Sequence, residues 1–463
     1  MTKAEASAAL AAAMLTCAVA GCATDDAARR AESRDEAVAR RRRETAAFFA
    51  TNAAPLTLSQ AVGLARERTL RLTEASLDAA LADIRKGTAF SAFLPRLDAK
   101  YMYAAADKNL VSEPILAGRG LTLGDSLETA GLALTQPVFM PNAWLMFFEA
   151  RHLHAAQEYR LERARQLLDV QVAAQFYELA VADALVGAYE SETNATAALE
   201  RQVSGLVDEG LAAKPDLVRV RTKRKNGCFE LRKANDRAEL ARARLADILR
   251  FMPGEPALKA DGASMMRVLE QPRKLTLEDA VMASLTNRLD LFAADRLTRV
   301  RKIEIWRALT QWLPEIAVAG GGSYASQELL ETTRFWSGGL VGALSLFKGF
   351  QSVNDYSRAR AERKAEYELL ERRMMAVVVS VIDAYRSRER AEEGAAVARA
   401  ALDSAQLDHA AAKDRFDEGR ETFSNLMDKI AELEKAKVCA ASADFARALA
   451  EIVFRNAIGE KLK

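Results

Sequence analysis

The longest regular pattern of apolar and polar positions in the chain runs over about 142–207. Its apolar positions recur at steps of seven, four, four and three residues, at Leu161, Leu168, Val172, Phe176 and Leu179. This spacing places them on one stripe of an α-helix. A proline-free stretch of this length predicts a helix of about 100 Å, at ~1.5 Å per residue. Ordinary globular helices are much shorter, so the pattern predicts a strut in a helical bundle or coiled coil.

Three sequence markers occur twice, in the same order. They are Leu-Thr-Leu and its continuation at 56–62 and 275–281, an aromatic-Leu-Pro triplet at 93–95 and 312–314, and Asp-Glu-Gly at 208–210 and 417–419. The first two pairs are offset by 219 residues and the third by 209. The common order and the nearly constant spacing predict a tandem duplication of about 210 residues.

Each half predicts the same succession of elements. Thr57 or Thr276 caps a helix that runs to the Leu-Pro pair, where the proline stops it. Apolar alternation with Gly-rich connections then predicts β-hairpins, at about 96–139 and 315–347. A long helix and a returning helix follow, at about 142–207 and 216–251 in the first half and about 350–416 and 425–458 in the second.

The N-terminal residues predict an export signal. The uncharged stretch 6–24 contains Val19-Ala20-Gly21-Cys22, which resembles a bacterial lipobox and implies cleavage before Cys22 and acylation of its thiol, as with palmitate. An uncleaved Ala-rich helix is the alternative. Ala23 after the cysteine favours delivery to the outer membrane. The expected organisation is a signal peptide at 1–21, a lipid-anchored tether at 22–55, and repeats at 56–273 and 274–463.

Composition argues against several classes of function. The net charge of +2 indicates no nucleic-acid partner. His152 and His154 are two residues apart on a helix and do not share a face, so they are a poor metal pair. The glycine run at 320–322 lacks the Lys-Ser/Thr of a phosphate-binding loop. We therefore expect no enzyme activity, metal or cofactor, and we expect Cys228 and Cys439, inside helical patterns, to be buried thiols.

The predicted strands have the length that a tilted membrane strand needs, about 10 residues. Four strands cannot close a barrel and an open edge cannot lie in lipid, so the chain must oligomerise if its hairpins insert. The uncharged residues at 129–148 contain Pro137 and Pro141, which favour a strand and a turn over a membrane helix. Aromatic residues gather where strands meet helices, as a membrane-interface girdle or a packed core would require: Phe90, Phe93, Trp144, Phe147, Phe148 and Trp312.

The duplicated order of these markers resembles the TolC-like outer membrane efflux proteins over about 56–460, and the lipobox resembles their lipoprotein branch. The resemblance implies a mainly α fold with β: a homotrimer whose 12-stranded outer membrane β-barrel continues into a periplasmic α-helical barrel. It implies an exit duct for small molecules such as drugs, working with an inner-membrane pump and a periplasmic adaptor. A type I protein secretion duct is one alternative, and a non-conducting, lipid-tethered periplasmic coiled coil is the other.

The resemblance also makes each Glu-Gly break a periplasmic tip. It implies a constriction at Asp216, Arg219, Asn425 and Asp428, and an adaptor-docking surface at Gly210, Leu211, Gly419 and Arg420. In a trimer each residue becomes a ring of three, and an acidic ring at Asp428 would favour cations. The residues themselves allow a simpler and compatible interpretation, in which the glycines end one helix and Asp216 and Asn425 cap the next.

Overall fold

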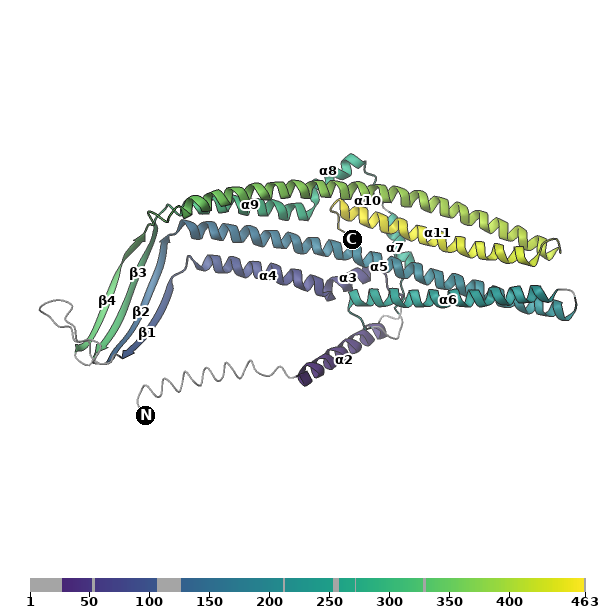
Figure 1. The fold of residues 1–463 in the computed structure, drawn as a ribbon, viewed down its shortest axis with the longest axis horizontal. Helices are drawn as coiled ribbons and strands as arrows, with labels where there is room; N and C mark the ends of the chain where they lie inside the picture. Colours follow the sequence, from purple (N-terminus) through teal and green to yellow (C-terminus); the bar gives the residue numbers. More distant parts are fainter. Residues whose placement is uncertain are drawn as a thin grey trace.

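The structure is a computed structural model that describes residues 27–51, 55–105, 126–210, 213–252, 258–270, 272–327 and 330–461. The predicted signal peptide, Cys22 and Leu211 lie outside these ranges. The described chain is strongly elongated, with a β-sheet at one end and paired helices extending away from it (Figure 1).

The elements repeat as the sequence predicts, so the predicted duplicated fold is confirmed. The first half contains α3 (Leu58–Arg68), α4 (Leu70–Ser91), β1 (Arg96–Ala105), β2 (Ser126–Phe139), α5 (Pro141–Asp208) and α6 (Lys214–Leu249). The second half contains α8 (Leu277–Asn287), α9 (Leu289–Thr310), β3 (Glu315–Gln327), β4 (Leu330–Ala343), α10 (Gln351–Asp417) and α11 (Phe423–Ala457). The short α7 (Gly262–Met266) and the 3-10 helix η2 (Arg267–Glu270) lie between the halves.

The prediction of a single helix from each threonine to the Leu-Pro pair is wrong, because each half has two helices there. Thr57 caps α3 through a capping box and Thr276 caps α8, as predicted. The chain then breaks at Thr69 and Arg288, which have extended backbones and the same 219-residue offset. Both residues are buried. At each break the chain changes direction, so that the short helix (α3 or α8) can pack against its neighbours. The spacing of apolar residues within either helix does not predict this change of direction.

The four strands form one antiparallel sheet in the order β1-β2-β3-β4. Gly321 lies opposite Ala133 where β3 meets β2. A Cβ atom at Gly321 would lie 2.4 Å from the carbonyl oxygen of Leu132, so the two backbones approach this closely only because the residue is glycine.

The long helices lie side by side in the order α6-α5-α11-α10, because α5 packs on both α6 and α11, and α11 packs on α10. The main core forms where the short helices cover α5. The predicted apolar stripe supplies it: Val172, Phe176 and Leu179 are fully buried, together with Leu245 of α6 and Ile452 of α11. The core therefore lies midway along the helices and joins the two halves.

Part of the expected tether is a helix, α2 (Ala27–Thr51). Its last turn packs on the core region, where the rings of Phe48 and Phe251 lie 5.0 Å apart. The hydroxyl of Thr45 accepts a hydrogen bond of 3.1 Å from the backbone N–H of Met252. The guanidinium of Arg68 lies 5.2 Å from the centre of the Phe251 ring. The segment is thus anchored at its C-terminal end.

The expectation of buried thiols is wrong, because Cys228 and Cys439 are both exposed. Their neighbours Gly227 and Ala440 are the buried positions. Successive residues on a helix are about 100° apart, so a one-residue difference decides which side chain faces the partner helix. The predicted aromatic gathering does form a contact cluster at the sheet end of α4 and α5, with Phe93 5.2 Å from Trp144 and 6.2 Å from Phe147.

Candidate functional site

The two faces of the sheet differ in chemistry. Residues opposite one another in the register share a face, and residues two apart along a strand share it too. One face, called the apolar face here, carries Leu97, Tyr101, Leu132, Leu134, Val318, Trp336 and Leu340, all substantially exposed. The other, called the polar face, carries Lys100, Thr135, Ser323, Ser337 and several glycines and alanines. Apolar-out and polar-in alternation is the signature of a membrane β-barrel strand.

The sheet has two open edges. In the described residues β1 pairs only with β2, and β4 only with β3, so both outer strands present unpaired backbone groups. The helices have the same arrangement, with α6 of the first half at one edge and α10 of the second half at the other. One edge of the molecule belongs to the first half (β1 and α6) and the other to the second half (β4 and α10). A second copy can therefore place its first-half edge against the second-half edge of this one and continue both the sheet and the helical layer. An isolated chain would leave a long strand edge unprotected.

Each long helical hairpin turns at a glycine, at the end of the molecule away from the sheet (Figure 1). Gly210 and Gly419 adopt left-handed backbones with φ of 77° and 72°, which end α5 and α10 as predicted. The next helices begin after Ala213 and Thr422, and the Thr422 hydroxyl accepts a hydrogen bond from the N–H of Asn425. The expectation that Asp216 and Asn425 are N-caps is therefore wrong, since both lie in the first turn instead.

The structure brings some of the predicted constriction residues together. Within one chain, Asp428 pairs with Lys223 of α6, with Nζ and Oδ1 3.0 Å apart. This contact joins the two hairpins near the tip. Arg219 pairs along its own helix with Asp216 at 3.6 Å. Asp428 and Arg219 are both exposed, as are Gly210, Gly419 and Arg420. Lys223 was not expected from sequence, because only the spatial meeting of α6 and α11 identifies it.

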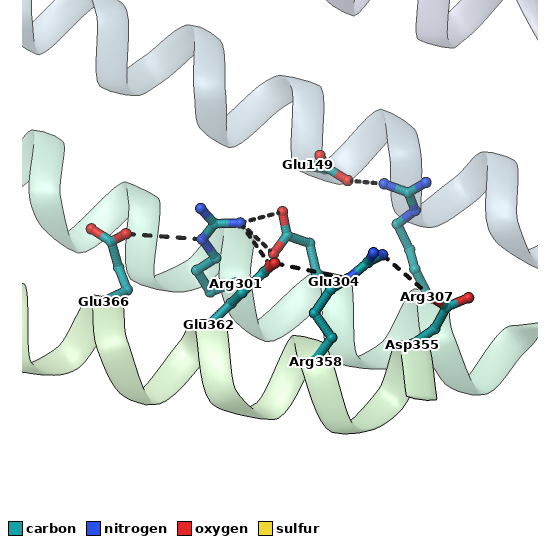
Figure 2. Close-up of polar contacts among 8 residues, drawn as sticks. All are labelled: Glu149, Arg301, Glu304, Arg307, Asp355, Arg358, Glu362 and Glu366. Atoms are coloured by element: carbon teal, nitrogen blue, oxygen red, sulfur yellow. Dashed lines mark hydrogen bonds and ion pairs between the residues drawn. The ribbon is translucent and has the colours of Figure 1, made fainter. Parts of the chain in front are cut away.

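A network of ion pairs that sequence reasoning missed lies where the helices meet the sheet. Figure 2 shows α9 supplying arginines that bind carboxylates on both neighbouring helices. Arg307 donates to Glu149 of α5 at 2.7 Å, and Arg301 donates to Glu362 of α10 at 3.2 Å. A hydrogen bond with Glu304 raises the pKa of Arg301 above its usual value. The network therefore clamps α9 between α5 and α10.

The signal for this network was present in the sequence. Asp355, Arg358 and Glu362 follow spacings of three and four, typical of charges on one face of a helix. The partners on α9 come from elsewhere in the chain, so the pattern alone favours a solvated face. A polar cavity of about 410 Å³ adjoins the network, lined by Asn142, Arg307 and Arg358 among others.

Ion pairs also lie near the breaks at Thr69 and Arg288, where α3 meets α4 and α8 meets α9; these breaks are called the corners of the two halves. The carboxylate of Asp169 on α5 is 1% exposed and accepts two hydrogen bonds from Arg66, the longer at 2.8 Å. Burial raises the pKa of Asp169, against the opposing effect of the Arg66 guanidinium. At the other corner, Arg288 makes a two-pronged pair with Asp290. Burial raises the pKa of Asp290, but the bonds and charge of Arg288 outweigh it, so this pKa lies below its usual value.

None of the helices in the described residues has a stretch apolar enough to span a membrane.

Residues 281–460 match the family described as outer membrane efflux protein. A search of curated protein sequences finds no match.

Several solved structures share the fold. The channel protein CusC is 17% identical with a TM-score of 0.72, covering 88% of this chain and 93% of its own. The CmeC outer membrane channel of Campylobacter jejuni is 17% identical with a TM-score of 0.71, covering 87% and 85%. The outer membrane protein VceC of Vibrio cholerae is 15% identical with a TM-score of 0.71, covering 88% and 97%.

Proposed function

We propose that this chain, whose residues 281–460 match the outer membrane efflux protein family, is a TolC-like exit duct through which a tripartite system exports small molecules. One observation carries the proposal: an exposed apolar sheet face continues into long paired helices, and both layers end in open edges. A lipid-tethered coiled coil would have no use for that sheet. A protein secretion duct would share this geometry and differ in its cargo.

A homotrimer supplies the missing partners of both edges. Two copies of the four-stranded sheet would give a barrel of about eight strands, which side chains fill. Three copies give about 12 strands, within the range of membrane barrels and wide enough for a lumen. In that assembly the apolar face meets lipid and the polar face, with Lys100, Ser323 and Ser337, lines the lumen.

The end of the duct away from the barrel would be its gate. Asp216, Arg219, Asn425 and Asp428 form the constriction, and Asp428 holds it through Lys223 of its own chain. A pair of exposed charges contributes about 0–1 kcal/mol, but three copies act together at the constriction. The Gly210–Leu211 and Gly419–Arg420 turns are the surface for a periplasmic adaptor, which in turn joins an inner-membrane pump.

Lipid attached to Cys22 would hold the N-terminus at the outer membrane, with the helical barrel in the periplasm. Anchoring at the last turn of α2, through Phe48 and Thr45, supports this arrangement because it ties the acylated segment to the middle of the duct. Mass spectrometry of the mature N-terminus should find a diacylated or triacylated Cys22, whereas an intact Met1 would contradict the anchor.

The main experiment measures assembly and conduction together. Crosslinking of the purified protein in detergent should give three times the mass of one chain, and planar bilayers should show channels. A monomer that conducts nothing would contradict the proposed function.

The gate is tested by Asp428→Ala, which should raise single-channel conductance and leave the trimer intact. Lys223→Gln should have the same effect, because it removes the other partner of the same contact. Lys233→Gln is the matched control, since Lys233 lies farther along α6 and pairs with Glu230 on the same helix, and Arg219→Gln separates this contact from one between chains. Wild-type conductance in both Asp428→Ala and Lys223→Gln would contradict the gate, and an effect of Arg219→Gln alone would move it to a contact between chains.

A further inference from the structure

A hollow of about 500 Å³ lies on the apolar face of the sheet. Its wall comes from all four strands, through Tyr101, Leu132, Gly322, Tyr324, Arg334 and Trp336. The exposed surface of this wall is mostly apolar. The hollow therefore combines depth and apolar character with the cation of Arg334, which shares the apolar face, while Lys100 reaches its lining from the neighbouring position of β1.

The hollow depends on the absence of a side chain at Gly322. In the register Gly322 lies opposite Leu132 on one side and Trp336 on the other. A Cβ atom at Gly322 would lie 2.8 Å from a carbon of the Trp336 ring, so the indole leans over the glycine. Trp336 is nevertheless 81% exposed, so its ring forms a wall that is open to the surroundings.

Arg334 supplies the cation. It lies two residues from Trp336 and therefore on the same face of β4. Its side chain is exposed. A guanidinium on a lipid-facing surface is costly near the middle of a bilayer and is tolerated near the interface. Such a group binds phosphate oxygens well, because its planar fork of donors matches their geometry.

The position of Arg334 along the strand fits an interface. It lies four residues from Leu330, the first residue of β4, and so about 14 Å from the end of the strand away from the helices. Tyr101 and Tyr324 lie at the same level of the sheet as Arg334, and Trp336 lies two residues nearer the helices on the same face. Tyrosine and tryptophan gather at membrane interfaces, where an apolar ring meets a polar head group.

We propose that the hollow binds one phosphate-bearing lipid, from the leaflet on the far side from the helices. An acyl chain lies along Leu132 and Gly322 beside the Trp336 ring, and the phosphate binds Arg334. This inference rests on the proposed function, which places the apolar face in lipid. A second copy of the chain is not the occupant, because it continues the strand edges of β1 and β4 and leaves the face free.

The experiment uses the purified full-length oligomer in detergent and native mass spectrometry. The probes are dioleoyl phosphatidic acid and dioleoylglycerol, which share their acyl chains and differ by the phosphate group. The wild type should bind the phosphorylated lipid about tenfold more tightly, the effect of one charge-assisted hydrogen-bonded contact. Arg334→Gln should abolish this preference. Arg96→Gln is the matched control, because Arg96 is an exposed cation on the polar face of β1 that pairs with Asp98 and does not line the hollow.

Gly322→Ala tests the apolar part of the site. The added methyl group must push the Trp336 ring, so binding of both lipids should weaken. An unchanged phosphate preference in Arg334→Gln, or an equal loss in Arg96→Gln, would overturn the proposal. Channel conductance is recorded on the same preparations: conducting oligomers without phosphate preference overturn only the lipid site, whereas a wild type that neither assembles nor conducts overturns the proposed function.

Discussion

Both corners contain an ion pair, but the buried partner is an acid in the first half and a base in the second. In the first half the acid is inside: the Asp169 side chain is 1% exposed and its partner Arg66 is 39% exposed. In the second half the base is inside: the Arg288 side chain is 11% exposed and its partner Asp290 is 38% exposed. Arg288 also donates to the Ser380 hydroxyl at 3.0 Å. Each corner is thus held by an ion pair, but the two pairs use different positions of the repeat, since Arg288 corresponds to Thr69 and not to Arg66.

Farther along the long helices the two halves retain the same polarity. Asp183 of α5 pairs with Arg242 of α6, and Glu392 of α10 pairs with Arg447 of α11 at positions with nearly the duplication offset. The first pair is closer, at 2.6 Å against 3.9 Å, and its acid is less exposed, at 29% against 68%. We infer that this ion pair contributes more to the stability of the first helical hairpin (α5 and α6) than its counterpart does to the second (α10 and α11).

The largest expected loss of stability comes from breaking the ion pair at the corner of the first half. Arg66→Met should destabilise the protein by about 3–5 kcal/mol, because it leaves the buried Asp169 carboxylate without its partner. Asp169→Asn should cost less, because the Arg66 side chain that remains can reach water. Thermal unfolding of the two variants gives the comparison, and equal losses would show that burial of Asp169 does not decide the cost.

A smaller effect compares the two hairpins. Asp183→Ala should lower the free energy of unfolding by about 1 kcal/mol, since its partner Arg242 is partly buried. Glu392→Ala is the matched variant, and its loss should be about 0.3 kcal/mol or less, because Glu392 is 68% exposed and lies 3.9 Å from Arg447. A greater loss for Glu392→Ala in chemical denaturation would reverse the ranking of the hairpins.

The smallest effect concerns pH at the second corner. The pKa of Asp290 lies below its ordinary value of 3.8 in the folded chain. Its stabilising contribution is therefore present above that value and is lost as the pH falls through the folded pKa. The difference in thermal midpoint between wild type and Asp290→Asn should be present at pH 7 and shrink toward pH 3. Asp169 should behave oppositely, since burial raises its pKa and its charge destabilises the fold as the pH rises through that value.

Sequence patterns predicted the elements well where local chemistry controls them. Thr57 and Thr276 cap helices because a threonine side chain satisfies free backbone N–H groups. Gly210 and Gly419 end helices because the turn needs a left-handed residue. The buried stripe through Val172, Phe176 and Leu179 followed from helical spacing alone.

The same patterns failed where two distant segments meet. Thr69 and Arg288 break their helices because the short helix must fold onto the long one, and neither residue is a strong local helix breaker. Cys228 and Cys439 are exposed because a difference of one residue turns a helix face away from its partner. Of the candidate constriction residues, Asp428 obtained a partner, Lys223, that no spacing in the sequence could identify.

The sequence by itself determined the duplication, the order of helices and strands, and the alternation that makes one face of each hairpin apolar. These properties depend on local or periodic patterns of residues, so they can be predicted from the amino-acid sequence alone. Tertiary structure alone decided which acids and bases meet, at the corners, at the tip and in the network around Arg301. It also decided that Trp336 covers Gly322 and opens a hollow there. Pairing of distant side chains depends on register and helix rotation, which a change of one residue reverses.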